Sequence, residues 1–274
     1  SHVVMAQGMD VVVVDVDEDT GLMDVDALSS TLQYCSDVLA VIAVDLGGRL
    51  VDSSALARVC RKHRIPLLID AAHSVGARLP DEDVPMVAYS FHALKNITTC
   101  GEGGAVLTYE KSQAERVREL ISHGHRGNDY VRFGFNYRLT AVQAVFGMSQ
   151  LLRLYNNLER KRQLYAMYVE KLQRTEGKPA LLYVDSVCPD SPEAPHLFQV
   201  HFDCRSMRKF VQHYLESKHI AVRVHYPCLF DWTSHRRAHY YGVRHVLFGA
   251  PDSTYSNDFE QVTLSLPFHV GMQE

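Results

Sequence analysis

Residues 90–104 read SFHALKNITTCGEGG, and this stretch decides which fold the chain can adopt. It sets one lysine, Lys95, between an apolar run at residues 84–91 and a cluster of glycines at residues 101–104. That run and a second one at residues 105–108 are typical of buried strands. Because a single lysine is most often a solvated side chain, the interpretation of Lys95 depends on the residues that surround it.

A second segment, residues 66–77, reads PLLIDAAHSVGA and predicts another apolar strand. Its C-terminal end carries a carboxylate, Asp70, and then an imidazole, His73. Ligand groups of open α/β sheets collect at the carboxyl ends of strands. The pairing of Lys95 with these two residues therefore favours a catalytic lysine over a solvated one.

Strand and helix patterns alternate along the first half of the chain, which indicates crossover units and a mostly parallel sheet with helices on both faces. We predict strands at residues 11–15, 38–44, 67–69, 197–202 and 220–224, and helices at residues 24–32, 52–63 and 207–217. Capping-box patterns at Ser112 with Glu115 and at Thr140 with Gln143 predict further helix starts. The second opens a long helix that we expect to connect two domains.

The composition fits a large globular chain with a sizeable core. It has 274 residues, of which 46% are hydrophobic and 22% charged, and a net charge of -4, which suggests neither a nucleic acid nor a membrane surface as partner. The six cysteines form no C-x-x-C pair, so we expect reduced thiols and a cytoplasmic protein. The closest histidine pair, His123 and His125, lacks a matching set of metal ligands, and we predict no zinc site.

The two segments around Asp70 and Lys95 resemble the DegT/DnrJ/StrS family of pyridoxal phosphate enzymes, the sugar aminotransferases with the aspartate aminotransferase fold. The shared motifs are the strand end DAAH at residues 70–73, the segment SFHALKN at residues 90–96 and the turn GEGG at residues 101–104. The variant SFHALKNIT looks most like the members that aminate 4-keto nucleotide sugars on the way to aminoarabinose or pseudaminic acid.

The resemblance extends over nearly the whole chain. Its further landmarks lie at residues 134–139, 143–151, 196–198, 224–227 and 264–268. It implies an α/β protein of the fold type I class of pyridoxal phosphate transferases, with a mostly parallel, seven-stranded-type sheet and a smaller α+β C-terminal domain. We expect the large domain at residues 1–152 and the small domain at residues 153–274.

Family members start with a further segment that holds a Gly-Thr or Gly-Ser phosphate-binding turn, and they continue into a last helix. Nothing in this chain corresponds to either, so we expect an internal fragment or a gene model that lacks both ends. The glycines at residues 101–104 precede a strand rather than a helix, so they predict a tight turn and not a phosphate cradle. We therefore expect the isolated chain to bind the cofactor weakly or not at all.

The resemblance also implies roles for single residues. Lys95 would condense with the cofactor aldehyde and later move a proton, which requires a lowered pKa. Asp70 would pair with the protonated pyridine nitrogen and keep the ring an electron sink. His73 would pack on the ring or bond its hydroxyl, although a satisfied core histidine explains it equally well. Ser90 would bind the cofactor phosphate.

Two expectations concern neighbours beyond the strand ends. Asn136 would reach the same phosphate from the second subunit, which makes the protein a homodimer. His225 and Trp232 would line the substrate pocket, an interpretation that rests on their position in the C-terminal half alone.

These observations leave three functions open. The first is an aminotransferase that moves an amino group from glutamate or glutamine to a keto group of a nucleotide-linked sugar, a UDP- or dTDP-4-keto sugar, for the amino sugars of cell-surface polysaccharides. The second is a sugar dehydratase of the same fold, but those relatives carry histidine in place of Lys95. The third is a truncated or regulatory relative without catalysis.

Overall fold

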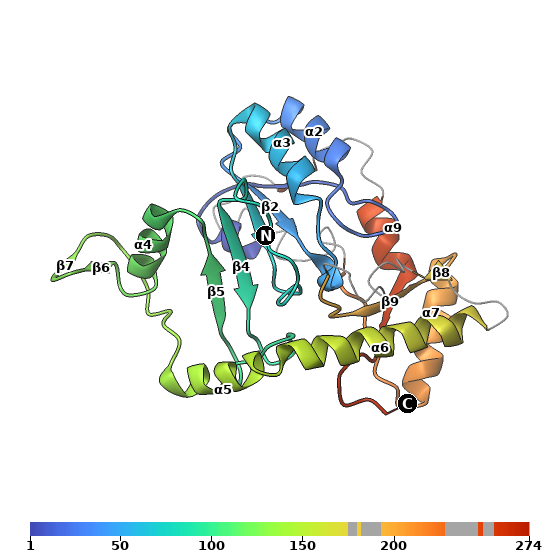
Figure 1. The fold of residues 1–274 in the computed structure, drawn as a ribbon. Helices are drawn as coiled ribbons and strands as arrows, with labels where there is room; N and C mark the ends of the chain where they lie inside the picture. Colours follow the sequence, from blue (N-terminus) through green and yellow to red (C-terminus); the bar gives the residue numbers. More distant parts are fainter. Residues whose placement is uncertain (175–179, 182–192, 228–245, 249–254, 274) are drawn as a thin grey trace. The chain divides into compact units, whose positions relative to one another are not determined.

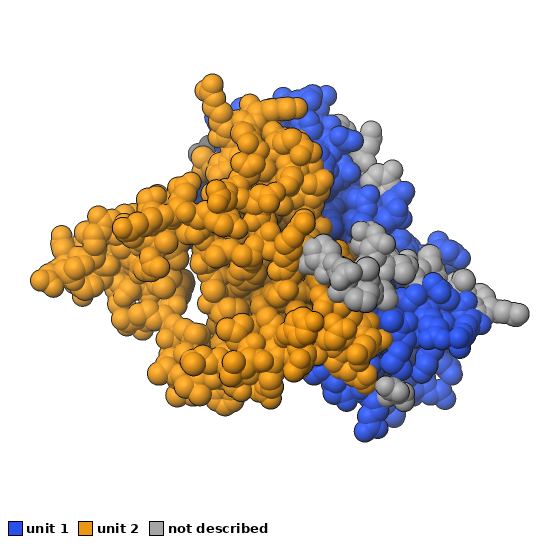
Figure 2. All heavy atoms as spheres, viewed as in Figure 1, with its two compact units in different colours: residues 1–38, 164–187, 197–274 blue, residues 39–163, 188–196 orange. Residues whose placement is uncertain are grey.

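The computed structural model describes residues 1–174, 180–181, 193–227, 246–248 and 255–273. The chain divides into two compact units, coloured separately in Figure 2. Unit 1 comprises residues 1–38, 164–187 and 197–274, and unit 2 comprises residues 39–163 and 188–196. The domain boundary expected after residue 152 stays a prediction.

Unit 2 is built on a four-stranded sheet in the order β2-β3-β4-β5 (Figure 1). Its strands are β2 (Val41–Val44), β3 (Leu67–Asp70), β4 (Met86–Ser90) and β5 (Gly104–Leu107). The first three are parallel and β5 runs antiparallel to β4. The short helix η1 (Leu46–Gly48) and α3 (Ser53–His63) make the crossover from β2 to β3, as the alternating pattern predicted.

Helix α3 begins where the sequence predicted. The carboxylate of Asp52 accepts a 2.8 Å hydrogen bond from the amide of Ala55, which satisfies one of the free donors of the first turn. The helix ends at Arg64, which adopts a left-handed conformation with φ 58°. Between these ends, Leu56 and Cys60 lie one helical turn apart and are buried, so one face of α3 belongs to the core.

The prediction that residues 84–91 and 105–108 are buried strands is right about the strands but wrong about the burial of the second. In β4, Val87 is fully buried, whereas the β5 residues are exposed or half-buried and Val106 is 45% exposed. Strand β5 is the last strand of this sheet, so it has only one paired neighbour in the described part of the chain.

After β5 come α4 (Lys111–Leu120), the short strands β6 (His125–Arg126) and β7 (Asp129–Tyr130), α5 (Ala141–Leu151) and α6 (Leu154–Gln173). The capping box at Thr140 is confirmed, because its side chain and that of Gln143 each bond the other's backbone amide. The box at Ser112 is wrong. Helix α4 already starts at Lys111, with Glu110 as an N-cap that makes no side-chain capping bond.

The expected long helix is interrupted between Leu151 and Leu154, where neither proline nor glycine marks the break. Helix α6 then passes from the residues of unit 2 into those of unit 1. The amino-terminal part of α5 lies against the glycine turn, since the side-chain amide nitrogen of Gln143 donates a 2.7 Å hydrogen bond to the carbonyl of Glu102.

Unit 1 contains two small sheets. In one, β1 (Val11–Val13) pairs in parallel with β10 (Val246–Phe248), and in the other β9 (Phe198–His201) lies between β8 (Ala180–Leu181) and β11 (Thr263–Leu266), all antiparallel. Its helices are α1 (His2–Met5), α2 (Val25–Tyr34), α7 (Arg205–Ser217) and α9 (Tyr255–Val262). Helix α2 is capped by Asp24 as predicted, through a 2.6 Å hydrogen bond from the amide of Ala27.

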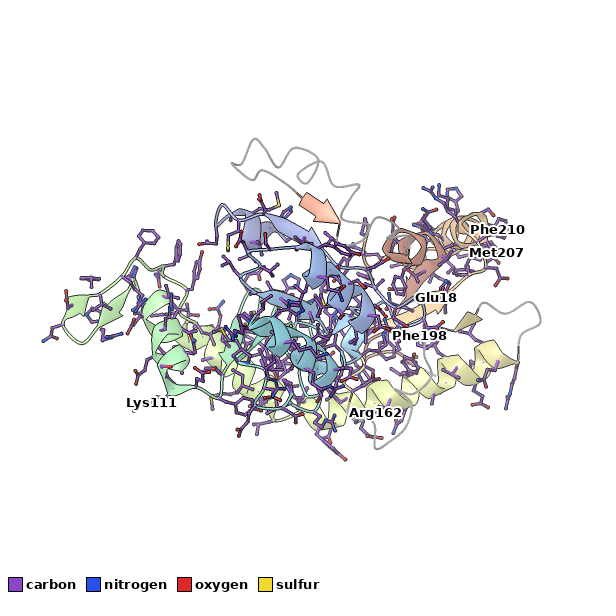
Figure 3. The ribbon with its side chains drawn as sticks, turned by 90° about the horizontal axis from the view of Figure 1, so that it is seen from above. Glu18, Lys111, Arg162, Phe198, Met207 and Phe210 are labelled. Atoms are coloured by element: carbon purple, nitrogen blue, oxygen red, sulfur yellow. The ribbon has the colours of Figure 1, made fainter. Side chains whose placement is uncertain are left out.

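Phe198 is at the centre of the unit 1 core (Figure 3), where its ring stacks on that of Tyr168 with centroids 4.4 Å apart. The predicted strand at residues 220–224 is wrong. That segment makes one bridge only, in which Arg223 and Ser265 exchange backbone hydrogen bonds. None of the helices in the described ranges is long and apolar enough to cross a membrane.

Candidate active site

Asp70 and Ser90 end two neighbouring parallel strands. Asp70 is the last residue of β3 and is in register with Ala88 of β4, two residues before Ser90 at the end of that strand. Side chains in register point to the same face of a sheet, and so do side chains two residues apart on one strand. Asp70 and Ser90 therefore share one face at one edge of the sheet, as the two strand-end motifs predicted.

Lys95 lies in the connection between β4 and β5. The ladder of these strands continues beyond their ends, since Phe91 donates to the carbonyl of Gly103 at 2.7 Å and Ala93 to that of Gly101 at 2.9 Å. Inside this frame the amide of Lys95 closes a turn by donating to the carbonyl of His92. The lysine is thus carried by an ordered loop at the same edge as Asp70 and Ser90.

The glycine cluster forms the tight turn that was predicted. Gly101 has φ +135°, which a residue with a side chain rarely adopts, and a Cβ atom on Gly104 would lie 2.6 Å from the carbonyl oxygen of Tyr89. Glycine at these two positions lets the loop return beside β4.

Burial lowers the pKa of the Lys95 amine, and the charge of Asp70 opposes that shift. Both effects act only because the lysine is half-buried and its ammonium group lies within electrostatic range of the Asp70 carboxylate. A lowered pKa increases the share of the neutral amine, the form that can attack a carbonyl and accept a proton.

The hydrogen bonds of the strand-end side chains leave them able to bind a ligand. Asp70 accepts from the amide of Ala72 at 3.0 Å through one carboxylate oxygen. The hydroxyl oxygen of Ser90 accepts from the amide of His92 at 3.3 Å, so its proton can be donated to another group.

His73 is only 5% exposed. Its Nδ1 atom accepts a 3.1 Å hydrogen bond from the amide of Gly47 in η1, which leaves the proton of the neutral ring on Nε2. The ring also packs on that of His196, with centroids 4.4 Å apart. Both interpretations offered by the sequence, a core histidine and a cofactor contact, are compatible with this position.

Three polar residues beside the site were missed in the sequence analysis: Asp45, Asn96 and Lys161. Asp45 follows β2, is buried, and accepts from the amide of Val51 at 3.0 Å and the hydroxyl of Ser74 at 2.7 Å. Burial raises the pKa of Asp45 to about 6, with a smaller contribution from Asp70 in the same direction.

Asn96 follows Lys95 directly, and its side chain accepts from the ammonium group of Lys161 at 2.7 Å. One signal could have found Lys161. It occupies the apolar stripe of α6 that Leu154, Leu158 and Tyr165 define at helical spacing.

The remaining candidates are Asn136, His225 and Trp232. Asn136 is exposed, bridges Ser122 through its backbone, and accepts from Nε of Arg138 at 3.3 Å. His225 belongs to unit 1, where its Nδ1 lies 2.8 Å from the hydroxyl of Ser265. Trp232 lies outside the described residues. Within the described ranges, histidine, cysteine and acidic side chains form no group of three that could hold a metal.

The family model of the DegT/DnrJ/EryC1/StrS aminotransferase family matches residues 1–274, and the chain belongs to this family. The predicted fold type, the aminotransferase activity and the pyridoxal phosphate cofactor are thereby confirmed. One similar protein is the UDP-4-amino-4,6-dideoxy-N-acetyl-beta-L-altrosamine transaminase of Campylobacter jejuni serotype O:23/36. It is 26% identical over 281 residues, which cover 99% of this chain and 72% of the relative.

Solved structures show the same fold. The aminotransferase TlmJ from Streptoalloteichus hindustanus superposes with a TM-score of 0.84 at 24% identity, covering 100% of this chain and 71% of that one. PseC of Helicobacter pylori, an aminotransferase of pseudoaminic acid biosynthesis, gives a TM-score of 0.79 at 24% identity and covers 96% of this chain and 69% of that one.

The residues at the strand ends fit pyridoxal phosphate. Lys95 offers an amine with a lowered pKa for the aldehyde, Asp70 a carboxylate for the pyridine nitrogen, and Ser90 a hydroxyl proton for the phosphate. The side chains of Asp70 and Ser90 each accept a hydrogen bond from a backbone amide, and the backbone amide of Lys95 closes the turn that carries its side chain.

Proposed function

We propose that this protein transfers an amino group from glutamate or glutamine to the keto group of a UDP- or dTDP-linked 4-keto sugar. The observation that carries the proposal is the half-buried amine of Lys95, whose pKa is lowered by burial beside the Asp70 carboxylate. The segment SFHALKNIT and the similarity to the altrosamine transaminase of Campylobacter jejuni support the sugar substrate.

Pyridoxal phosphate supplies an aldehyde that carries the amino group and a ring that accepts electrons. In this proposal Lys95 holds the cofactor between turnovers, and its freed amine then moves a proton to and from the carbon that carries the nitrogen. Burial lowers the pKa of Lys95, which increases the share of the neutral amine, the form that can accept this proton. Histidine would replace this lysine in a dehydratase, so Lys95 favours amino transfer.

Asp70 and Ser90 hold the two polar ends of the cofactor in this scheme. The carboxylate of Asp70 keeps a proton on the pyridine nitrogen, and the hydroxyl of Ser90 donates to the phosphate. His73, whose Nδ1 accepts from the amide of Gly47, would pack on the cofactor ring or bond its hydroxyl.

We further propose a homodimer, because the surface around α5 is apolar and uncovered. Helix α5 has no buried residue although most of its side chains are apolar. Exposed large apolar side chains lie on this helix and in the segments before and after it: Tyr130, Val131, Phe133, Phe135, Tyr137, Leu139, Val142, Val145, Phe146, Met148, Leu151, Leu152 and Tyr155. A second copy of the chain would remove this surface from water.

Asn136 lies within that apolar stretch. Since arginine only donates, the hydrogen bond from Arg138 fixes the amide oxygen of Asn136 toward the arginine. The amide nitrogen then remains as a donor, which suits a phosphate in the site of the second subunit. The division into domains at residues 1–152 and 153–274 and a cytoplasmic location belong to the same proposal; the four described cysteines, all of them free, support the latter.

The test is a pair of half-reactions followed by product analysis. Protein loaded with pyridoxal phosphate is mixed with glutamate or glutamine while its visible absorbance is recorded, and then with UDP- or dTDP-4-keto sugars. We expect mass spectrometry to find an amino sugar. Lys95→Ala should give none, whereas Lys111→Ala, a change at an exposed lysine of α4, should behave as the wild type. Loss of water without gain of nitrogen would make the protein a dehydratase.

A further inference from the structure

The side chain of Asn96 connects three separate segments of unit 2. Its amide oxygen accepts from Lys161 of α6 at 2.7 Å and lies 3.2 Å from Nδ1 of His196. Its amide nitrogen donates to the carbonyl of Ala194 at 3.3 Å and, more weakly, to that of Val75 at 3.5 Å. We call Asn96, Lys161 and His196 the Asn96 cluster.

The chemistry of these groups fixes how each is oriented. Lysine only donates, and the carbonyls of Val75 and Ala194 only accept, so the amide of Asn96 has one orientation that satisfies all of them. In that orientation its oxygen faces His196, which must therefore carry a proton on Nδ1. The cluster specifies both the amide orientation and a histidine tautomer.

The Asn96 cluster contacts His73, another candidate residue of the active site. The ring of His196 packs on that of His73. Gly47 connects the same two residues, because its amide donates to Nδ1 of His73 and its carbonyl accepts from the backbone amide of His196. His73 is thus held from two sides by groups that are tied to His196. The Asn96 cluster therefore contacts His73 and includes the residue that directly follows Lys95.

Lys161 is the most unusual member of this set. It is 9% exposed and lies on the stripe of α6 whose residues Leu154 and Leu158 pack against Gly76, just beyond the strand end that carries Asp70. Burial lowers the pKa of Lys161 to about 8, so the ammonium form still dominates at neutral pH. Burying an ammonium group has a cost in folding free energy. An apolar side chain at the same place on the stripe would not have this cost.

We propose that Lys161 is a positioning residue of the reaction: by holding the amide of Asn96, it fixes the backbone from which Lys95 extends. This inference rests on the proposed role of Lys95, and it adds a residue that reaches the reacting atoms only through Asn96. An amine displaced by about 1 Å can lose two orders of magnitude in rate, so a modest loosening of Asn96 is enough to be measured.

The test compares Lys161→Met with Lys161→Gln, which retains a donor, and with Lys111→Met, the same change as the first at a lysine of α4 that is 90% exposed (Figure 3). The first readout needs no cofactor. The proteins are acetylated under competition in the apo form, and the rate at Lys95 relative to the other lysines is mapped by mass spectrometry. We expect Lys161→Met to change this relative rate at least about threefold and Lys111→Met to leave it unaltered.

The second readout is the loaded enzyme. Lys161→Met should lower kcat by about tenfold or more with the KM for the amino donor within about twofold, and it should shift the pH midpoint of the visible band. Lys161→Gln should recover part of the rate. Where Lys161→Met does not fold, Lys161→Gln and Asn96→Ala provide the same comparison.

A double variant separates positioning from a general effect on stability. If Lys161 acts through Asn96, the variant Lys161→Met/Asn96→Ala should be no slower than Asn96→Ala alone. Losses that multiply, or wild-type kcat together with unchanged acetylation of Lys95 in Lys161→Met, would overturn the proposal. Failure of the proposed function would look different, because the wild type would then form no amino sugar, or Lys95→Ala would form as much of it as the wild type.

Discussion

Asp45 and Asp70 lie at the carboxyl ends of two neighbouring parallel strands, β2 and β3. The backbone amide of Asp45 donates a 3.0 Å hydrogen bond to the carbonyl oxygen of Asp70. The two carboxylates differ in environment. Asp45 is buried and bonded to Ser74 and Val51, whereas Asp70 is half-buried at the edge where the cofactor is proposed to lie. The buried carboxylate of Asp45 therefore has the desolvation cost, while the carboxylate of Asp70 remains available to a ligand.

Replacing Asp45 should alter how stability depends on pH. Burial raises the pKa of Asp45 from 3.8 to about 6, so between these values the folded state binds more protons than the unfolded state, and stability falls as pH rises through that window. A shift of this size corresponds to about 3 kcal/mol. Relative to the wild type, Asp45→Asn should gain about that much in unfolding free energy between pH 4 and pH 7.

Denaturant titrations at several pH values measure this gain. The control is Asp26→Asn, at an exposed position in the first turn of α2, which removes a carboxylate without changing a buried group. A constant difference between Asp45→Asn and the wild type would mean that Asp45 is not a strained carboxylate.

Lys95 should be the residue that holds pyridoxal phosphate. Borohydride reduction of the loaded protein followed by peptide mapping should place the label on Lys95, because burial beside Asp70 lowers the pKa of its amine. Lys95→Ala should abolish amino transfer. Label on Lys111 or Lys161 would contradict this assignment.

Asp70→Asn should bind the cofactor but turn over slowly, since a neutral amide cannot retain a proton on the pyridine nitrogen. A pairing worth one to two pKa units corresponds to roughly 1.4 to 2.7 kcal/mol, hence at least about a tenfold loss in rate. Stopped-flow measurement of the half-reaction with glutamate gives the rate directly. Near-normal turnover would remove Asp70 from the proposed site.

Local sequence patterns predicted features that depend on residues close in the sequence, such as the starts of helices. The caps at Asp24, Asp52 and Thr140 were predicted because each cap bonds an amide three residues ahead. The pattern at Ser112 failed for the same local reason: the helix could begin one residue earlier, at Lys111, without a capping side chain.

Features that depend on distant partners were harder to predict. The exposure of β5 depends on what lies beyond the edge of the sheet, and the segment at residues 220–224 forms no strand because it finds a single bridge, to Ser265. The strand-end pair Asp70 and Lys95 was found because the parallel topology brings carboxyl ends together. The bond from Lys161 to Asn96 joins residues 65 positions apart, and no spacing rule indicates it.

Complementation at limiting cofactor between an impaired variant, Asn136→Ala, and an inactive one, Lys95→Ala, should show whether Asn136 serves the site of the other subunit. Asn136→Ala removes one hydrogen bond to the phosphate, worth about 1.5 to 3 kcal/mol, so activity at limiting cofactor should fall at least about tenfold. Lys95→Ala should be inactive. In a mixed dimer, the Lys95 of one subunit and the Asn136 of the other form one intact site, and random mixing should restore about a quarter of wild-type activity.

The apolar face of α5 provides the control for this experiment. Val142→Glu places a charge on a side chain that is 68% exposed in the single chain, so the fold should tolerate it, whereas a dimer interface would not. Phe210→Glu, on the exposed face of α7 and 69% exposed (Figure 3), is the matched change elsewhere. Sedimentation velocity should find monomers for Val142→Glu and dimers for Phe210→Glu, and Val142→Glu should prevent complementation. If the mixture regains activity while the protein is monomeric, or if stable mixed dimers regain none, Asn136 does not serve the site of the other subunit. It would then act within its own subunit or have no role in the site.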